Sequence, residues 1–561
     1  MSSRNHRRIS RREALGALGG LGVTLLNSSA LFAIINGLVK REAQAQMGAG
    51  SVGNLIYLLH HGAPARWCFD GFLNPSGNPD HFIANGSVKN ALQVGQYRAG
   101  TPSNAIYRQT TNPFEYDLGT EKKNIYLPAL WDCTLPTVES ASIPMKSLLN
   151  HMCIVRGVAM PGDIGHDKGP LLLVRPHPTR LSLSGLVADA STRRVPAVGF
   201  GRFNGFSARN ASLFKGRIKT NENPLDHLLG PLKLNTPVLN SAEDLNLKNW
   251  NSSLIRSKFD AALGALEQNA KLHHPGAEKF YGNLRLSRNL IDEAASLFGD
   301  LKAEFEGRCE RYKQVARNCA SQIGATLGSA DTPDAYLLPQ FNLQAGAGQI
   351  ALYAPILAVT EFLIQKELSS SLTFSVTTGF NPPNFSGMDS EPIYAYDEHS
   401  QSNRQLSAIA LNLNFRVLMS SLNLFKSQIG SHFDKTLVVI GAEYSRKPSF
   451  DSAGSDHAAS ANTVSLFSGM FQNFIPIGDI YKESGVPGGK YAGTWGQGAP
   501  TLLRTTLNGQ NRELAVRITN SEISKTIADL VGVSSPVSGH SLLEKIGGKW
   551  VSKAVGEPKN V

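Results

Sequence analysis

Short apolar runs without polar alternation are the feature that most constrains the fold of this chain. A strand that is apolar throughout is buried on both faces, and such strands alternating with helical segments are typical of a largely parallel sheet covered on both sides. Each run is short enough to be a single strand and is bounded by loop-forming residues. The expected strands of this kind are residues 54–60, 151–158, 195–200 and 436–441. Residues 372–377 are expected to be the strand that follows the helix at 348–368.

The segments between these runs have helical character. Residues 290, 294, 297, 301 and 305 are Leu, Ala, Leu, Leu and Phe, and their spacing of three and four predicts an amphipathic helix. We expect it to be one of a pair of helices in an insertion at about 249–322. The other expected helices are 183–189, 348–368, 402–429 (with Gly430 at its C-cap position) and 522–530.

Composition excludes two broad classes of protein. The 561 residues are 41% apolar and 18% charged, as in a globular chain rather than a disordered one. The net charge is +11, but residues 1–45 carry seven basic and two acidic side chains. The remaining chain has 48 basic and 42 acidic residues, a net charge of +6 that is too dilute to indicate nucleic-acid binding.

The amino-terminal residues have the layout of an export signal. Residues 1–12 are polar and basic, residues 14–39 are mostly apolar, and Ala43-Gln44-Ala45 is a small-x-small cleavage site. The segment from Ser10 to Gly16, with Arg11-Arg12, resembles the twin-arginine consensus. We therefore expect residues 1–45 to be a signal peptide read by the twin-arginine translocase, and the protein to be periplasmic or secreted. The alternative is an uncleaved membrane anchor, since the apolar run is long enough to span a bilayer.

The five cysteines do not suggest a disulfide framework. They are odd in number and contain no CxxC pair. If Cys309 and Cys319 lie on one helix, they are about 15 Å apart, too far for a disulfide. Buried free thiols are the expected state.

Ionisable residues cluster where four of the expected strands end, which is where functional groups gather in open α/β sheets. The clusters contain carboxylates and imidazoles without thiolates, a donor set that suits a divalent metal such as Zn, Mn or Ca. They are His60-His61-Gly62 with Asp70, Gly162 to Asp167 with His166, Tyr396 to His399, and Glu443 to Arg446 followed by Gly454 to His457.

Two of these motifs have the spacing of metal ligands. Asp397 and His399 are two residues apart, so in extended chain they lie on one side and can share an ion. Asp456 and His457 are adjacent and can reach one ion only from a turn, which the preceding Ser and Gly residues favour. The alternative is that either pair, taken alone, occurs by chance and binds no metal.

The remaining clusters admit a structural interpretation as well as a functional one. Arg446 can bind a phosphate or sulfate in bidentate fashion, or form a structural pair with Glu443. His60 and His61 can be ligands, or a histidine that ends a strand can simply hydrogen-bond a carbonyl.

The segment Thr436 to Pro448, followed by Gly454-Ser455-Asp456-His457, resembles the strand–Glu–aromatic–x–Arg–x–Pro and Asp-His signature of a large bacterial family. That family is catalogued as domain of unknown function 1501 and grouped with the alkaline-phosphatase and sulfatase-like superfamily. Tyr396 to His399 is similar to its Trp-Asp-Thr-His element. The resemblance covers most of residues 50–545.

The resemblance implies a three-layer α/β/α sandwich of the alkaline-phosphatase type and hydrolysis of a phosphate or sulfate ester at a metal site. It implies Asp397, His399, Asp456, His457 and His166 as metal ligands. It further implies Glu443 and Arg446 as catalytic residues, acting on a small anionic ester. The chain departs from the family after the first strand, where Gly62-Ala63-Pro64-Ala65 offers no nucleophile. The alternative is therefore a non-catalytic envelope protein on a degenerate hydrolase fold that binds a glycan or a protein partner.

Overall fold

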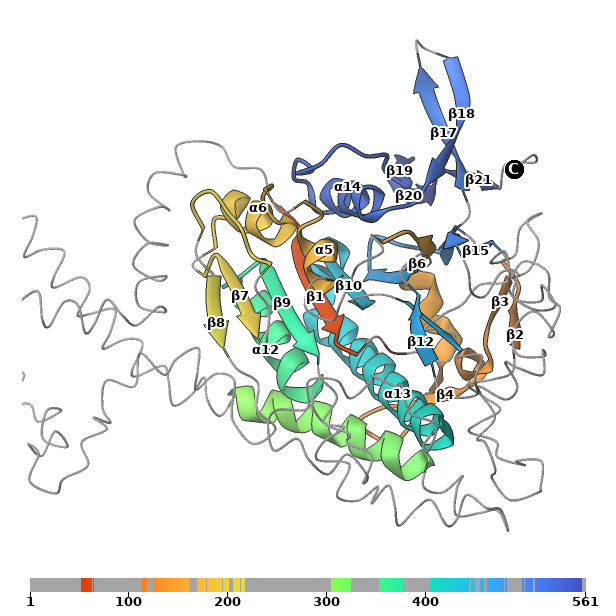
Figure 1. Ribbon diagram of the computed structural model, residues 1–561. Helices are drawn as coiled ribbons and strands as arrows, with labels where there is room; N and C mark the ends of the chain where they lie inside the picture. Colours follow the sequence, from red (N-terminus) through yellow and green to blue (C-terminus); the bar gives the residue numbers. More distant parts are fainter. Residues whose placement is uncertain are drawn as a thin grey trace, which may run out of the picture.

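An eight-stranded sheet forms the centre of the molecule, with strand order β14-β6-β13-β10-β1-β9-β7-β8 (Figure 1). The computed structural model describes residues 52–62, 64, 113–118, 125–160, 169–177, 179–193, 195–200, 205–211, 213–216, 304–323, 353–376, 404–442, 445–448, 455–458, 462–478, 480–481, 497–498, 500–507 and 510–556. In this sheet β13 runs antiparallel to both of its neighbours, and the other strands run parallel to one another. The chain therefore has an α/β fold with a mixed, mostly parallel sheet.

All five predicted strands are confirmed, as β1, β6, β7, β9 and β10. Three further strands, β8, β13 and β14, complete the sheet. The bounds are β1 (Asn54–His60), β6 (Met152–Val158), β7 (Ala197–Phe200), β8 (Leu213–Gly216), β9 (Ser371–Val376), β10 (Thr436–Ala442), β13 (Asn462–Ser468) and β14 (Ile475–Ile477).

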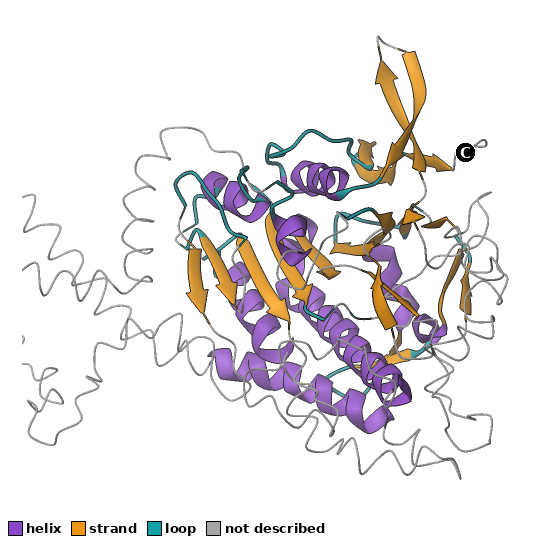
Figure 2. Cartoon of the chain, viewed as in Figure 1, coloured by secondary structure: helices purple, strands orange, loops and turns teal. Residues whose placement is uncertain are grey.

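Helices cover both faces of this sheet, so the described chain has three layers (Figure 2). Successive residues of β1 alternate between two cores, because strand side chains point to opposite faces. Ile56 and Leu58 belong to one core and Leu55, Tyr57 and Leu59 to the other. The first core includes the helix at residues 304–323, α12 (Tyr353–Gln365) and α13 (Arg404–Ile429), and the second includes α5 (Gly169–Val174), α6 (Leu183–Ala190) and α14 (Asn520–Val531).

The predicted helices at 183–189, 348–368, 402–429 and 522–530 are confirmed as α6, α12, α13 and α14. Gly430 follows α13 with φ +53° and begins the 3-10 helix η7 (Gly430–Lys435). Of the expected insertion at 249–322, the structure describes only the helix at 304–323, which we call the core helix. Its buried side chains, Phe305 and Tyr312 among them, are part of the first core, so this helix packs as an integral layer of the domain.

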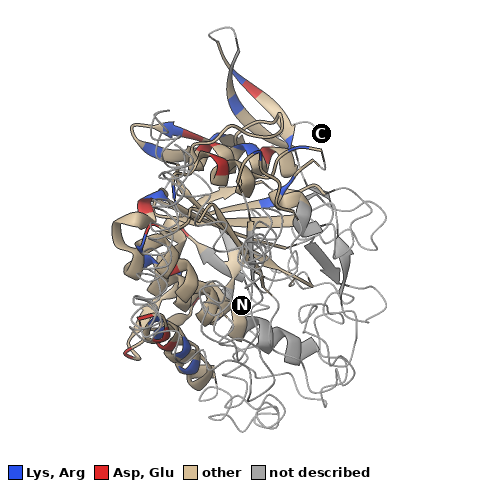
Figure 3. Cartoon of the chain, turned by 90° about the vertical axis from the view of Figure 1, so that its left-hand side faces the viewer, with Lys and Arg blue, Asp and Glu red and all other residues tan. Residues whose placement is uncertain are grey.

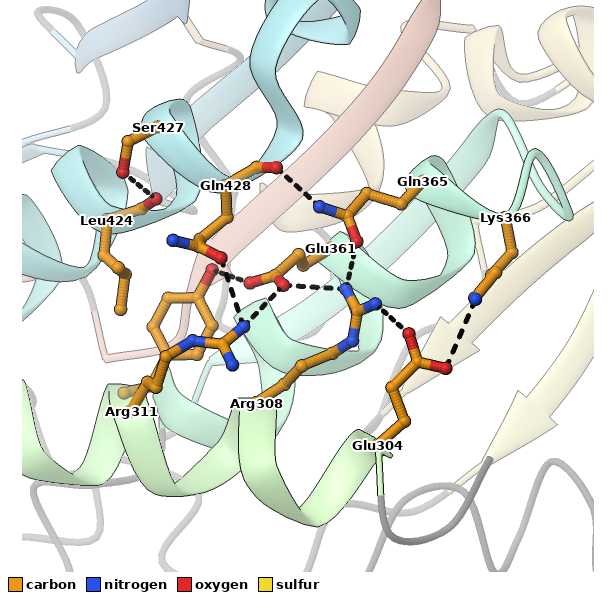
Figure 4. Close-up of polar contacts among 10 residues, drawn as sticks. Glu304, Arg308, Arg311, Glu361, Gln365, Lys366, Leu424, Ser427 and Gln428 are labelled. Atoms are coloured by element: carbon orange, nitrogen blue, oxygen red, sulfur yellow. Dashed lines mark hydrogen bonds and ion pairs between the residues drawn. The ribbon is translucent and has the colours of Figure 1, made fainter. Parts of the chain in front are cut away.

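A buried ion network joins the core helix to α12 (Figure 4). The Glu361 carboxylate is 1% exposed and accepts hydrogen bonds from Arg308 at 2.7 Å, Arg311 at 3.0 Å and the Tyr312 hydroxyl at 2.8 Å. Burial, followed by the charge of Glu361, raises the pKa of Tyr312 well above its usual value, so the hydroxyl remains a proton donor. The network fixes the register of the core helix against the domain, because a buried carboxylate is tolerated only with its partners in place.

The rim of the same network reaches solvent. Arg308 and Lys366 both contact Glu304, at 2.5 and 3.2 Å. Burial alone would raise the pKa of Glu304, but hydrogen bonds and charges from these two cations lower it overall. Gln365 donates to the Gln428 carbonyl and so ties α12 to α13.

Charged residues are sparse in the central strands and gather on the outer helices and the carboxyl-terminal hairpins (Figure 3). Arg156 of β6 and Lys215 of β8 are the only Lys, Arg, Asp or Glu residues in the eight strands. The hairpin formed by β17 (Pro500–Leu507) and β18 (Gln510–Arg517) projects from the body (Figure 1).

Short 3-10 helices and small sheets surround the central sheet. The 3-10 helices are η2 (Ala129–Asp132) and η3 (Met145–His151). The small sheets are formed by β2 (Pro113–Tyr116) with β3 (Ile125–Pro128), β4 (Thr134–Pro136) with β5 (Ser142–Pro144), β11 (Ser445–Pro448) with β12 (Ser455–Ala458), β15 (Ile480–Tyr481) with β16 (Gln497–Gly498), β19 (Leu543–Ile546) with β20 (Lys549–Ser552), and β18 (Gln510–Arg517) with β17 (Pro500–Leu507) and β21 (Ala554–Gly556).

Cys153, Cys309 and Cys319 are buried free thiols, as expected, and the last two share the core helix. Cys68 and the export signal, residues 1–45, lie outside the described residues. Within the described part of the chain, no helix combines the length and the apolar character that crossing a membrane requires.

Candidate functional site at the carboxyl edge of the sheet

The carboxyl ends of three parallel strands lie side by side at one edge of the sheet. His60, the last residue of β1, is in register with Val376 of β9 on one side and with Ala442 of β10 on the other. In open α/β folds this edge is where ligands bind, because loops of variable sequence leave the sheet there. Four predicted site clusters follow strands that end at this edge or directly beside it.

His60 is fully integrated into the fold. It is 1% exposed, and its Nε2 atom hydrogen-bonds the Tyr353 hydroxyl at 2.9 Å. Tyr353 is the first residue of α12, so this contact joins the central strand to the helix layer at the carboxyl edge. The backbone N–H of His61 donates to the Val376 carbonyl, and Gly62 turns the chain away with φ +90°. The His60 imidazole is therefore held in one orientation by an aromatic hydroxyl.

A two-stranded ribbon leaves the same edge directly after β10. Its strands are β11 and β12, which pair antiparallel so that Arg446 is opposite His457 and Lys447 is opposite Asp456. The structure therefore brings together two of the predicted site positions, Arg446 and His457. Opposite residues of an antiparallel pair have Cα atoms about 4.5–5.5 Å apart.

The turn expected at Asp456 and His457 is a strand instead. Both residues belong to β12, and the backbone of Ser455 to Ala458 pairs with β11. The physical reason is that β11 offers a partner for these backbone groups, and a paired ladder satisfies hydrogen bonds that a turn would leave to side chains or water. The other predicted site residues lie outside the described residues, and they are His166, Asp397, His399 and Glu443.

Buried amides join the strand ends at the base of the ribbon. The Asn462 Nδ2 atom donates to the Ala442 carbonyl at 3.1 Å and to the Met160 sulfur at 3.5 Å. The Asn520 amide donates to the same sulfur at 3.5 Å. Gly157, with φ +79°, lies at the irregularity where β6 pairs with the start of β13. These contacts tie together the ends of β6 and β10 and the starts of β13 and α14.

Among the described residues of β1, β6, β9, β10 and β13, Arg156 is the one Lys or Arg. It is 1% exposed and is in register with Thr463 of β13. Among the residues that the structure describes, no three His, Cys, Asp or Glu side chains gather as a metal site would require. A metal at this edge would therefore need ligands from residues beyond the described ones.

No sequence pattern indicates the residues that organise this edge. Tyr353 is 293 residues from His60, and Asn462 is 302 residues from Met160, so no local pattern could connect them. Comparison with family models, with curated proteins and with solved structures finds no match for this chain.

Proposed function

We propose that this protein is an exported, metal-dependent hydrolase of small phosphate or sulfate esters on an alkaline-phosphatase-like sandwich. The observation that carries the proposal is the ribbon at the carboxyl edge, where Arg446 is opposite His457. A guanidinium group recognises the planar pair of oxygens on a phosphate or sulfate, and an imidazole is a common metal ligand. The two groups required to bind an anionic ester and a metal therefore occupy paired positions.

The residues have distinct roles in this proposal. His457 of the ribbon would bind a divalent metal together with Asp397, His399 and His166. Asp456 precedes it in the extended strand β12, where neighbouring residues lie on opposite faces, so these two residues do not share one ion. Arg446 holds the anionic group of the ester, and Glu443 serves as a ligand or as the base. A Zn, Mn or Ca ion bound there would supply a Lewis acid and a water of lowered pKa. This arrangement makes water the nucleophile, in keeping with the absence of Ser or Thr between His60 and Ala65.

Metal-dependent stabilisation tests the proposal directly. With free Zn²⁺ or Mn²⁺ a hundredfold above Kd, the metal should add about 2.7 kcal/mol to the free energy of unfolding. His457→Ala should abolish this gain. Lys447→Ala is the matched control, because Lys447 lies in the same ribbon but is not a ligand, and it should retain the gain.

Hydrolysis by the metal-loaded protein separates the anion-binding role from the metal-binding role. Phosphate monoesters, phosphate diesters and sulfate esters should be screened, and Arg446→Ala should raise KM at least tenfold while leaving the metal-induced stabilisation intact. If the wild-type protein shows neither metal-dependent stabilisation nor hydrolysis of any of these esters, the proposed enzyme is excluded.

One observation favours a second function. The sequence after β1 reads Gly62-Ala63-Pro64-Ala65 and lacks the nucleophile of the superfamily that the chain resembles. The second candidate is a non-catalytic envelope protein that binds a glycan or a protein at the same edge.

A further inference from the structure

The ribbon is an excursion of the chain that begins and ends at the same point of the sheet. It leaves after Ala442, the last residue of β10, and returns at Asn462, the first residue of β13. These two residues are 20 positions apart, and the hydrogen bond from the Asn462 side chain to the Ala442 carbonyl closes the excursion at its base. Both residues are buried, at 1% and 0% exposure.

The amide extends the sheet where its ladder stops. The pairing of β10 with β13 ends at Ile440 and Ser465. Beyond that pair, the Asn462 side chain supplies the next link to β10. A buried amide is costly unless it is hydrogen-bonded, and here Asn462 Oδ1 also accepts from the Thr463 backbone N–H at 2.8 Å. The Asn462 side chain therefore bridges β10 and β13 at the point where their backbones no longer pair.

A second contact anchors the amide to the rest of the edge. Met160, two residues past the end of β6, accepts hydrogen bonds at its sulfur from both Asn462 and Asn520. Asn520 is the first residue of α14, whose start is fixed by a capping box between Thr519 and Glu522. The base of the ribbon is thus tied to a rigid helix end and to the strand that precedes His166.

We propose that Asn462 is the positioning residue of the ribbon and holds Arg446 and His457 in place against the carboxyl edge. The functional part of this inference rests on the proposed hydrolase, whereas the positioning part concerns the ribbon alone. Asn462 acts through the Ala442 carbonyl, one residue before Glu443 and four before Arg446. Loss of its donor should therefore loosen the ribbon without unfolding the sheet.

Hydrogen exchange on the full-length protein measures this effect. Asn462→Ala should raise amide exchange at residues 445–448 and 455–458 roughly tenfold, the effect expected for one lost hydrogen bond. Asn54→Ala is the matched control. Asn54 is also 1% exposed and donates its amide to Thr436 at 2.8 Å, at the opposite end of β10. It should leave exchange in the ribbon unchanged.

Two further variants isolate the donor from side-chain volume. Asn462→Leu fills the same space without a donor and should behave like Asn462→Ala. Met160→Leu keeps the packing, removes the sulfur acceptor and should raise exchange in the same two segments by a smaller factor. If Asn462→Ala does not fold, amide exchange in the ribbon of Met160→Leu tests the positioning role instead. If amide exchange in the ribbon of Asn462→Leu or of Met160→Leu is as slow as in the wild-type protein, the positioning role is overturned.

Binding of Zn²⁺ alone connects the positioning role to function. In Asn462→Ala the Kd for Zn²⁺ should rise about tenfold, and in Asn54→Ala it should not change. If the wild-type protein binds no metal, the proposed hydrolase fails while the exchange data still decide the role of Asn462. If the wild-type protein binds Zn²⁺ and Asn462→Ala binds it equally well, the functional part of the inference fails.

Discussion

Replacing Glu361 by alanine should lower the free energy of unfolding by about 3–5 kcal/mol. The carboxylate is 1% exposed and accepts three hydrogen bonds, from Arg308, Arg311 and Tyr312. After truncation Arg311, which is 37% exposed, can turn toward water, but Arg308 is only 8% exposed and keeps a buried charge. The Tyr312 hydroxyl also loses its acceptor, which by itself costs about 1–3 kcal/mol.

The same network offers a matched control. Glu304 also pairs with Arg308, but its side chain is 36% exposed. Because solvent screens an exposed pair, Glu304→Ala should cost no more than about 1 kcal/mol. Arg308→Met combined with Glu361→Leu removes both buried charges and should be less destabilising than Glu361→Ala alone, since no buried charge is left without a partner and the more exposed Arg311 can turn toward water.

Urea denaturation followed by circular dichroism measures these differences, provided that each variant keeps the wild-type slope of unfolding free energy with urea. A loss below about 1 kcal/mol for Glu361→Ala, or equal losses for Glu361→Ala and Glu304→Ala, would refute the reasoning. In either case the network would be an exposed, solvent-screened cluster and would not fix the core helix.

Two other predictions concern the thiols and the amino terminus. Burial raises the pKa of Cys319 from 9.0 to about 11 and that of Cys309 to about 12, so these thiols stay protonated in the folded state while they ionise in the unfolded state near pH 9. Stability should therefore fall as pH rises from 9 to 11, and a double Cys→Ala variant should flatten this decline in urea denaturation. Arg11→Lys with Arg12→Lys should leave the protein in the cytoplasm on cell fractionation, because paired guanidinium groups are not replaced by ammonium groups. Normal export of that variant would contradict a twin-arginine signal.

Most strands that sequence reasoning found are those whose burial is matched by apolar side chains, and an exception is β9, in which Thr373 and Ser375 are buried. β1 and β10 are uninterrupted apolar runs, so their burial could be predicted from composition alone. β13 is equally buried but contains Asn462, Thr463 and Ser465, and these polar residues conceal it from an apolar pattern. Its polarity is tolerated because Asn462 hydrogen-bonds residues remote in the sequence, which no local pattern reveals.

The sequence could predict which candidate residues follow the strand ends, but not how those residues are arranged. Strand ends identified the carboxyl edge, because that rule follows from the sheet topology alone. The pairing of Arg446 with His457 depends on the register of two short strands that residues 449–454 separate in the sequence, and the sequence favoured a turn at Asp456 and His457. The contact of His60 with Tyr353 depends on where α12 begins, which only the packed structure shows.

The position of β1 has a consequence for the timing of synthesis and export. Its first residue pairs with Thr436 of β10, 382 residues later in the chain. At roughly 5–20 residues per second, a ribosome needs roughly 20–80 s to make that partner after β1 has emerged. Because β9 begins only at residue 371, the central strand has neither of its two neighbours for most of this interval, while the amino-terminal segment has already been made. A route that threads unfolded chains would begin within that interval, whereas a translocase that carries folded proteins acts after it. The topology of the sheet thus suits the proposed twin-arginine export, because the central strand gains both of its neighbours only after residue 442 has been translated.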